Sequence, residues 1–394
     1  YPRPQMQRDE WVNLNGLWQY AIRPKDEGKP AKWDGRILVP FAVESALSGG
    51  KRTVGPENRL WYRRTFKSPD VPSDGRLLLH FGAVDWHATV YVNGQQVGEH
   101  KGGYDPFTFD ITDALKRDGD NELSVSVWDP TDAHWQPRGK QVREPHGIWY
   151  TSVTGIWQTV WLEPVPKAWI DAIRITSVVD RSEVRITARF AGDLAAVQLA
   201  SVTVTGNGEV IGGGQFAAIQ PFVNKNEHTW TIKIPDARLW SPDDPFLYEL
   251  KVAILCRGDQ SDHIESYFGM RKIEFKKHTD GFNRLFLNNE PVFQYGPLDQ
   301  GWWPDGLYTA PTDEALRYDI EITKQLGFNM ARKHVKVEPA RWYYWADRLG
   351  LLVGPPGSVP RPPRDGRHAG ASVVEPAPLA LARDEPRGRG PLPG

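Results

Sequence analysis

Four side chains in the last third of the chain have the types that bind a hydroxyl-rich ligand. Arg332 and His334 stand two apart in the predicted strand 328–335, so they share a face, and both can hydrogen-bond hydroxyl groups. Asp299 and Trp303 lie in the loop 296–306, where a carboxylate accepts hydrogen bonds and an indole stacks on C–H surfaces. The alternatives are that Arg332 pairs with a buried carboxylate, that His334 packs, and that Trp302 or Trp303 is buried for packing where the loop covers the rim of the sheet.

The surrounding pattern predicts the elements that position these residues. Short strands are expected at 292–295, at 328–335 and from 351 onward. One helix is expected after Thr312 as N-cap, and a second is expected to open at Glu338-Pro339. Each predicted helix is followed by a glycine, Gly327 and Gly350 respectively. A strand–helix–strand–helix–strand series predicts a parallel sheet with ligand groups at the carboxyl ends of its strands. Because a full eightfold barrel takes about 250 residues, residues 278–353 are interpreted as the beginning of a (β/α)8 TIM barrel.

Two β-regions precede this segment. Residues 1–166 show short alternating apolar runs and an Asn93-Gly94 turn signal, which predict a β-sandwich of the jelly-roll type. Residues 167–277 show the same period over a length typical of an immunoglobulin-like β-sandwich. Trp86, Trp135 and Trp157 are expected in the sandwich core or at a domain contact, with a sugar-binding surface as the alternative. The expected fold class is therefore multidomain.

Composition excludes several classes of function. The 394 residues carry 48 Lys+Arg and 49 Asp+Glu, a net charge of −1, so nucleic acid is not an expected partner. One cysteine and no Cys/His cluster exclude an internal disulfide and give no reason to expect a metal or other cofactor. No apolar run approaches the ~18 residues of a membrane span. The first residue is Tyr1, so localisation stays open, with a periplasmic or secreted protein expected if a signal peptide precedes it. Oligomeric state is left open.

Residues 354–394 differ from the rest in composition. This segment is rich in Pro, Gly and Arg and contains no aromatic residue, so it is expected to be disordered. A natural linker is one interpretation. The favoured one is a frameshifted tail, because the change of character falls at an apolar strand and not at a domain boundary.

Several motifs, in this order, resemble glycoside hydrolase family 2, the family of many β-galactosidases, β-glucuronidases and β-mannosidases. The first β-region contains VDWHATVYVNG at 84–94, GGYDPF at 102–107 and GIWQTVWLE at 155–163. The second contains LWSP at 239–242 and FGMRKI at 268–273, and the third contains LNNEPVF at 287–293 and GFNMAR at 327–332. The resemblance implies a jelly roll, an immunoglobulin-like sandwich and a catalytic TIM barrel.

The resemblance also implies the chemistry. Family members are retaining exo-β-glycosidases that use two glutamates, one as acid/base and one as nucleophile. Both glutamates follow later barrel strands, so no catalytic residue is assigned here, and the chain itself is expected to be inactive. Glu290 is interpreted as a hairpin residue and Glu338 as a helix-start residue. Many members carry R-x-x-H where this sequence has Arg332-Lys333-His334, with the histidine one position earlier.

The expected partner is a β-glycoside, and Arg332, His334, Asp299 and Trp303 are the candidate substrate-binding residues. A non-catalytic carbohydrate-binding protein built on the two sandwiches is the alternative function. A purely structural interaction module is a third.

Overall fold

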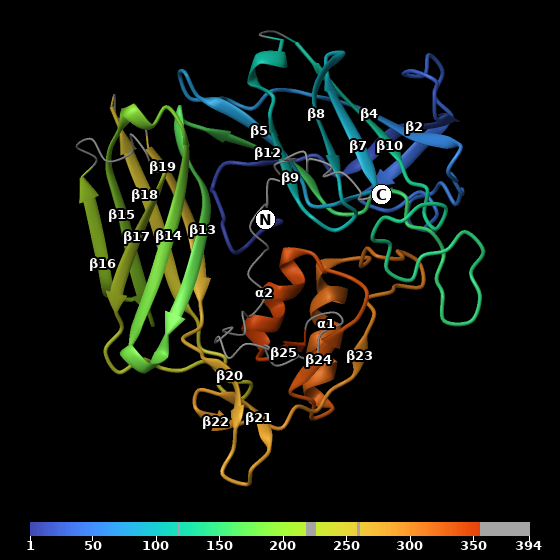
Figure 1. Ribbon diagram of the computed structural model, residues 1–394. Helices are drawn as coiled ribbons and strands as arrows, with labels where there is room; N and C mark the ends of the chain where they lie inside the picture. The colour runs from blue at the N-terminus through green and yellow to red at the C-terminus, as the bar shows by residue number, and fades with distance from the viewer. Residues whose placement is uncertain (117–118, 218–225, 258–260, 355–394) are drawn as a thin grey trace, which may run out of the picture.

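Three bodies of regular structure surround the N-terminal segment in the computed structural model (Figure 1). The structure describes residues 1–116, 119–217, 226–257 and 261–354. Two of the bodies are β-sandwiches, and the third combines two helices with a parallel sheet. The expected tail lies outside the described residues except for Gly354. Among the residues described, neither helix is long and apolar enough to cross a membrane.

The first sandwich consists of two antiparallel sheets, of order β3-β2-β4-β10-β7-β8 and β1-β12-β5-β9, with β6 paired to β11. Alternating side chains from both sheets form one apolar core, as the period-2 pattern predicts. The Asn93-Gly94 turn joins β7 to β8 with both residues at positive φ, 52° and 85°, as its sequence predicts. The elements are β1 (Val12–Asn13), β2 (Gly16–Pro24), β3 (Gly35–Val39), β4 (Asn58–Phe66), β5 (Arg76–Phe81), β6 (Val84–Asp85), β7 (His87–Val92), β8 (Gln95–Lys101), β9 (Phe107–Asp110), a 3-10 turn (Thr112–Ala114), β10 (Asn121–Trp128), β11 (Gly155–Ile156) and β12 (Val160–Val165).

The second sandwich packs a three-stranded sheet, β13-β14-β17, on a four-stranded sheet, β16-β15-β18-β19. Its core is separate from the first and contains the cysteine, Cys256, as a buried thiol. The three-plus-four arrangement is the one expected of an immunoglobulin-like sandwich. Its elements are β13 (Ala168–Val178), β14 (Glu183–Gly192), β15 (Val197–Gly206), β16 (Glu209–Ala217), β17 (Glu227–Lys233), β18 (Tyr248–Cys256) and β19 (Ser261–Phe268), with 3-10 turns at Val179–Arg181 and Leu194–Ala196.

The α/β unit follows a small antiparallel sheet and contains the parallel strands. The small sheet is formed by β20 (Ile273–Lys277), β21 (Asn283–Leu287) and β22 (Glu290–Pro291). The α/β unit runs β23 (Leu298–Asp299), α1 (Asp313–Gln325), β24 (Met330–Lys333), α2 (Ala340–Leu349) and β25 (Leu352–Gly354). Its strands are parallel in the order β23-β24-β25, and the helices pack against them through Leu316, Ile320, Trp342 and Ala346.

The helix signals agree with the structure, but one strand prediction was wrong. Thr312 caps α1 by accepting a hydrogen bond from the Ala315 amide at 3.1 Å, and Gly350 ends α2 at a φ of 78°. The first parallel strand lies at Leu298–Asp299 and not at 292–295. Two features explain the shift: the Asn329 side chain, instead of a strand carbonyl, accepts from the Tyr295 amide, and Pro297 has no amide to donate.

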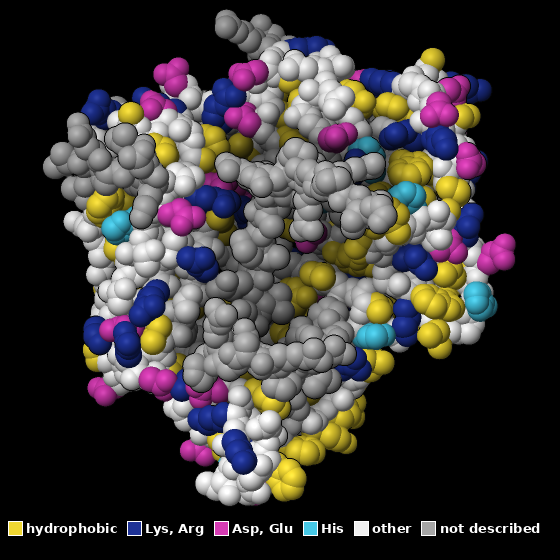
Figure 2. Space-filling model, in the orientation of Figure 1, with side chains coloured by type: hydrophobic (Ala, Val, Ile, Leu, Met, Phe, Trp, Pro, Cys, Tyr) yellow, Lys and Arg dark blue, Asp and Glu magenta, His cyan; other side chains and the backbone are white. Residues whose placement is uncertain are grey.

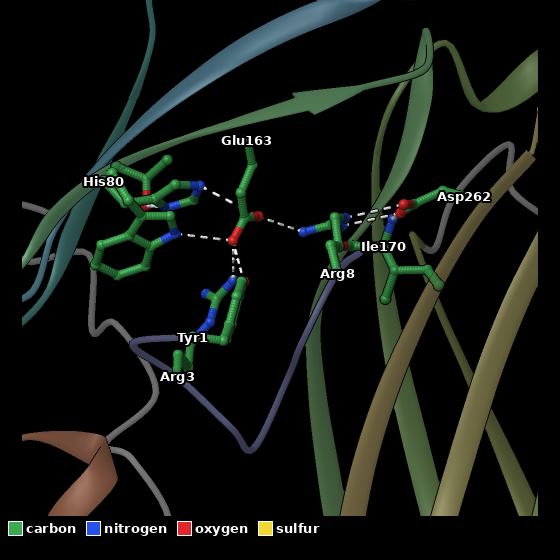
Figure 3. Close-up of polar contacts among 9 residues, drawn as sticks. Tyr1, Arg3, Arg8, His80, Glu163, Ile170 and Asp262 are labelled. Atoms are coloured by element: carbon green, nitrogen blue, oxygen red, sulfur yellow. Dashed lines mark hydrogen bonds and ion pairs between the residues drawn. The ribbon is translucent and has the colours of Figure 1, made fainter. Parts of the chain in front are cut away.

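An N-terminal strap, residues 1–9, links the two sandwiches through a buried ion network (Figure 3). Arg8 contacts Glu163 of β12 at 2.6 Å and both carboxylate oxygens of Asp262 of β19 at 2.9 Å. Glu163 also accepts from Tyr1 and from the Trp161 indole. Burial would raise the pKa of Glu163, but His80 and the arginines around it hold that pKa well below its usual range. The strap therefore supplies the positive charge of Arg8, which pairs with a buried carboxylate from each sandwich.

The same strap also contacts the α/β unit. The Tyr1 carbonyl accepts from Arg341 of α2 at 2.9 Å, and the Gln5 amide group donates to the Ala340 carbonyl at 2.8 Å. Arg341 in turn forms an ion pair with Asp313 at the start of α1. The nine residues of the strap thus contact all three bodies.

Candidate functional site

A buried charge cluster, made of Asp299, Lys333, Lys336 and Glu338, lies at the carboxyl ends of β23 and β24. Lys333 Nζ is 2.8 Å from Asp299 Oδ2 and 2.5 Å from Glu338 Oε1. Lys336 Nζ is 2.9 Å from Glu338 Oε2. The side chains of Lys333 and Lys336 have no exposed surface, and that of Asp299 retains 31% of its exposure. Asp299 is therefore the member of the cluster that a solute can reach.

Strand register and a strained turn place these groups. Asp299 and Lys333 are direct partners in the parallel pairing of β23 with β24. After β24 ends, Val335 adopts a φ of 59°, a region that β-branched residues rarely enter. After this turn the chain returns toward Lys333, so that Glu338 forms ion pairs with both Lys333 and Lys336. Strain of this kind persists only where the surroundings impose it, and it is typical of binding sites.

Burial and opposite charge act against each other on the two lysines. Burial would lower the pKa of Lys333, but Glu338 and Asp299 outweigh it and the pKa is raised. For Lys336 burial prevails and the pKa is lowered, although Glu338 opposes the shift. The Lys333 ammonium also lies 4.7 Å from the Trp342 ring centroid. Both carboxylates of the cluster are committed to ammonium groups, so the cluster is suited to orienting groups more than to transferring protons.

The first sandwich forms one wall of this region. Lys336 donates to the carbonyls of Gly301 and Tyr308 at 2.7 Å, which fixes the loop after β23. The Tyr308 hydroxyl lies 3.1 Å from that of Tyr104 in the first sandwich. Trp302 stacks on Tyr150 of the first sandwich with ring centroids 4.4 Å apart and planes inclined by 16°. Residues from two bodies therefore meet at the carboxyl edge of the parallel sheet.

A cavity of about 340 Å³ opens beside the cluster. Its lining includes Asp299, Trp302, Tyr150 and Asp319, the last of which lies on α1. Burial and the nearby Asp299 carboxylate raise the pKa of Asp319. Aromatic faces beside carboxylates suit a neutral, hydroxyl-rich ligand. Among the described residues, no three His, Cys, Asp or Glu side chains converge as metal ligands would.

The sequence-predicted residues do not all meet in this cavity. Asp299 lines it, while Arg332 and His334 lie on the neighbouring strand and at its end. The side chain of Arg332 is exposed, and the His334 amide donates to the Asp299 carbonyl at 2.9 Å. Burial and the nearby Lys140 and Arg332 charges lower the pKa of His334. Trp303 packs against the apolar core of the α/β unit, and it is its neighbour Trp302 that lines the cavity.

Sequence reasoning missed Lys333 and Lys336, considered Trp302 only as a residue buried for packing, and gave Glu338 a different role. Glu338 lies two positions before α2, which begins at Ala340, and its carboxylate bonds to the two lysines instead of the helix end. A signal was present in the sequence: charged residues at 333, 336 and 338 adjoin a strand expected to be buried. Lysines placed there need partners, because unpaired charges are rarely buried.

We expect Lys336→Met to lower the free energy of unfolding by about 1–3 kcal/mol. The substitution leaves the Gly301 and Tyr308 carbonyls without their donor, while Glu338 keeps Lys333 as its partner. Urea unfolding followed by tryptophan fluorescence measures the change. Lys25→Met, at a lysine exposed on the first sandwich, is the control. A Lys336 variant as stable as this control would contradict the assigned role.

Comparisons with known proteins identify the family. Residues 51–155 match the model described as "Glycosyl hydrolase 2 galactose-binding domain-like", and residues 168–271 match "Glycosyl hydrolases family 2". The chain belongs to glycoside hydrolase family 2. The two matched segments fall in the first and second sandwiches, in the order that the motifs predict.

Curated relatives are longer than this family 2 chain. A putative β-glucuronidase of Formosa agariphila is 30% identical over 354 residues, which cover 86% of this chain and 40% of the relative. A β-galactosidase of Thermoanaerobacter pseudethanolicus is 30% identical over 301 residues, which cover 74% of this chain and 38% of the relative. The chain thus spans about two fifths of the length of these relatives.

Solved structures of β-glucuronidases share the fold. The β-D-glucuronidase of Dictyoglomus thermophilum matches with a TM-score of 0.70 at 20% identity, covering 90% of this chain and 59% of that one. The Bifidobacterium dentium β-glucuronidase complexed with coumarin-3-O-glucuronide matches with a TM-score of 0.71 at 21% identity, covering 90% and 62%. At these identities the similarity establishes the shared fold.

Proposed function

We propose that this chain contributes two β-domains and the beginning of the catalytic barrel to a retaining exo-β-glycosidase. The proposed division is 1–166, 167–277 and 278–353, with 354–394 as a frameshifted tail. The observation that carries the proposal is a parallel strand–helix–strand–helix–strand unit that follows, after the small sheet of β20–β22, two sandwiches matched by family 2 models. This is the arrangement with which a (β/α)8 barrel begins.

In this proposal the carboxyl edge of the parallel sheet forms part of the glycoside pocket. Asp299 accepts hydrogen bonds from sugar hydroxyls, and Arg332 and His334 donate to the ligand from the neighbouring strand. Trp303, a half-buried residue of the same loop, contributes part of its ring to the pocket wall. Three observations support this: the cavity at Asp299, the aromatic wall of Trp302 and Tyr150, and the strained Val335 turn. The two glutamates that retention requires would come from later strands of the barrel.

Restoring the reading frame tests this proposal. Resequencing the coding DNA over residues 340–394 should reveal a single-base change that continues β25 into further strand and helix patterns with an Asn-Glu pair. The restored protein should hydrolyse at least one p-nitrophenyl β-glycoside among the galactoside, glucuronide and mannoside. Absence of any such frame, or a restored protein without hydrolysis, would refute the proposal.

The 394-residue chain itself is expected to show no turnover of the same three substrates. The chemical step needs two carboxylates about 5 Å apart, one as acid and one as nucleophile, and the carboxylates of the buried charge cluster are bound to lysines. Release of nitrophenolate, followed by absorbance, measures the rate, with a full-length family 2 β-glucuronidase as positive control. A rate above that of a heat-treated sample would contradict this expectation.

A non-catalytic carbohydrate-binding protein is the second candidate. The observation that favours it is the match of residues 51–155 to a galactose-binding domain-like model. Calorimetric titration of the whole chain with galactose, glucuronate and mannose distinguishes the two candidates. If the 394-residue chain binds one of these sugars and the frame-restored protein shows no hydrolysis, carbohydrate binding is favoured over hydrolysis.

A further inference from the structure

The connection between β10 and β11 carries an aromatic row that ends in solvent. Trp128, the last residue of β10, is fixed by a hydrogen bond from its indole nitrogen to the Pro56 carbonyl at 2.8 Å. His134 packs edge-on against it with ring centroids 6.2 Å apart. The ring centroids of His134 and Trp135 are in turn 5.6 Å apart. Trp135 is 84% exposed, which corrects the expectation that it lies in the core or at a domain contact. Trp157, in contrast, is buried as expected.

A polar groove lies in the same connection. It has a volume of about 290 Å³ and is lined by Asp132, Val142, Arg143, Glu144 and His146. Arg143 donates to Asp132 at 2.6 Å, and this pair joins the groove to the turn that presents Trp135 three residues later. The Gln136 side chain, itself buried, holds this turn by donating to the Thr131 carbonyl at 2.7 Å. The groove and the ring are thus parts of one ordered loop.

The surface that contains this loop is apolar in patches and carries histidines. On the right side of Figure 2, hydrophobic and histidine side chains gather where Figure 1 draws the long β10–β11 connection. Ile148 in this connection is also exposed. Isolated exposed apolar residues are common on proteins, but an indole supported by two further rings, in the same connection as a polar groove, is a more specific arrangement.

We propose that this loop binds a saccharide, with the Trp135 indole stacked on a sugar ring and the groove bonding to its hydroxyls. An indole face packs on the apolar C–H face of a sugar, while Arg143 donates and Glu144 accepts. With Arg143 paired to Asp132, the remaining charge of the lining is the negative one of Glu144, which fits a neutral ligand better than a phosphate or nucleic acid. The volume is at the small end for ligand sites, as one or two sugar rings require. The groove shares no lining residue with the cavity of the proposed glycoside pocket, although the Val142 amide of the groove donates to the carbonyl of Tyr150, which lines that cavity, at 2.9 Å.

Titration of the whole chain with cellotetraose, laminaritetraose and β-1,4-galactotetraose, followed by tryptophan fluorescence and calorimetry, tests the proposal. At least one oligosaccharide should give saturable binding. Trp135→Ala should weaken it about tenfold or more, a loss in the range that one aromatic contact supplies. Trp135→Phe should retain most of the affinity, and Arg143→Met should weaken it as well.

Phe293→Ala is the matched control, because Phe293 is 81% exposed on a different part of the chain. It should bind as the unaltered chain does. No saturable binding to any of the three oligosaccharides would overturn the proposal. The proposal would also be overturned if binding persisted in Trp135→Ala and were lost in Asp299→Asn. Such binding would belong to the glycoside pocket, and the proposed function would then still stand.

Discussion

Replacing Arg8 with alanine is expected to lower the free energy of unfolding by about 3–5 kcal/mol. The guanidinium is buried and bonds to Glu163, to Asp262 and to the Ile170 carbonyl. Burial would lower the pKa of Arg8, but Asp262 and Glu163 outweigh it and raise that pKa, so the group is held as a cation. Without Arg8, Asp262 loses the partner that binds both of its carboxylate oxygens, and Glu163 loses one of its cationic partners while keeping His80 and Arg3.

Urea unfolding, followed by circular dichroism and tryptophan fluorescence, measures this effect. The free energy of unfolding of Arg8→Lys should lie between those of the unaltered protein and Arg8→Ala. An ammonium keeps the charge but cannot bond to both oxygens of Asp262 in the same way. Arg317→Ala is the control: its partner Glu321 is one turn away on an exposed face of α1, and the loss should stay below about 1 kcal/mol. A loss at Arg8 as small as that of the control would show that the network does not stabilise the fold.

Replacing Glu44 with glutamine is expected to remove part of the pH dependence of stability. The Glu44 carboxyl accepts from the Thr154 amide at 2.9 Å, and its other oxygen, Oε1, is buried without a partner among the described residues. Burial raises the pKa of Glu44 to about 8, and the nearby Asp129 adds to the shift. The folded protein therefore keeps this proton at pH values where the unfolded chain has released it.

The sign follows from the proton count. Above the usual pKa of about 4.5, the unfolded chain binds fewer protons than the folded one, so stability falls as the pH rises toward 8. The loss is at most about 1.4 kcal/mol per pH unit for this one group. Burial also raises the pKa values of Asp85 and Asp129, so these residues add to the slope in the same direction. These three carboxyls thus favour the folded state at pH 5 over pH 8, while His80, His87 and His100, whose pKa values burial lowers, oppose this slope below their usual pKa of 6.5.

Glu44→Gln resembles the protonated carboxyl at every pH. Unfolding measured in urea from pH 5 to pH 8 should show a slope smaller than that of the unaltered protein, and the variant should be the more stable of the two at pH 8. Glu57→Gln, at an exposed glutamate of the same sandwich, is the control and should leave the slope unchanged. Equal slopes for the Glu44 variant and the unaltered protein would refute the assigned protonation.

The sequence predicted those parts of the fold that depend on neighbours along the chain. The period-2 apolar pattern located both sandwiches, and Thr312, Gly327 and Gly350 marked helix ends, because caps and turns depend on only a few residues. The strand expected at 292–295 was wrong because the Asn329 side chain, more than thirty residues away, competes for the Tyr295 amide. Local pattern carries no information about such a contact.

The polar sites were harder to predict for the same reason. Asp299 was found because a carboxylate beside tryptophans in a loop after a predicted strand suits a sugar subsite, but Lys333 and Lys336 have the type expected of surface residues. Their burial depends on the loop carbonyls at 301 and 308 and on ring faces supplied by other segments. Arg8 is separated by 155 residues from Glu163 and by 254 from Asp262. Pairings at such distances become visible only when the chain is folded.

The position of the N-terminal strap has a consequence for the order of assembly. Its residues are synthesised before every group that they bind, yet Glu163, Asp262 and Arg341 exist only after most of the chain has been made. Contacts across such sequence separations form late, since the loops between them must close first. The strap must therefore stay unpaired until both sandwiches and α2 have formed, and its docking would complete the folding of the molecule.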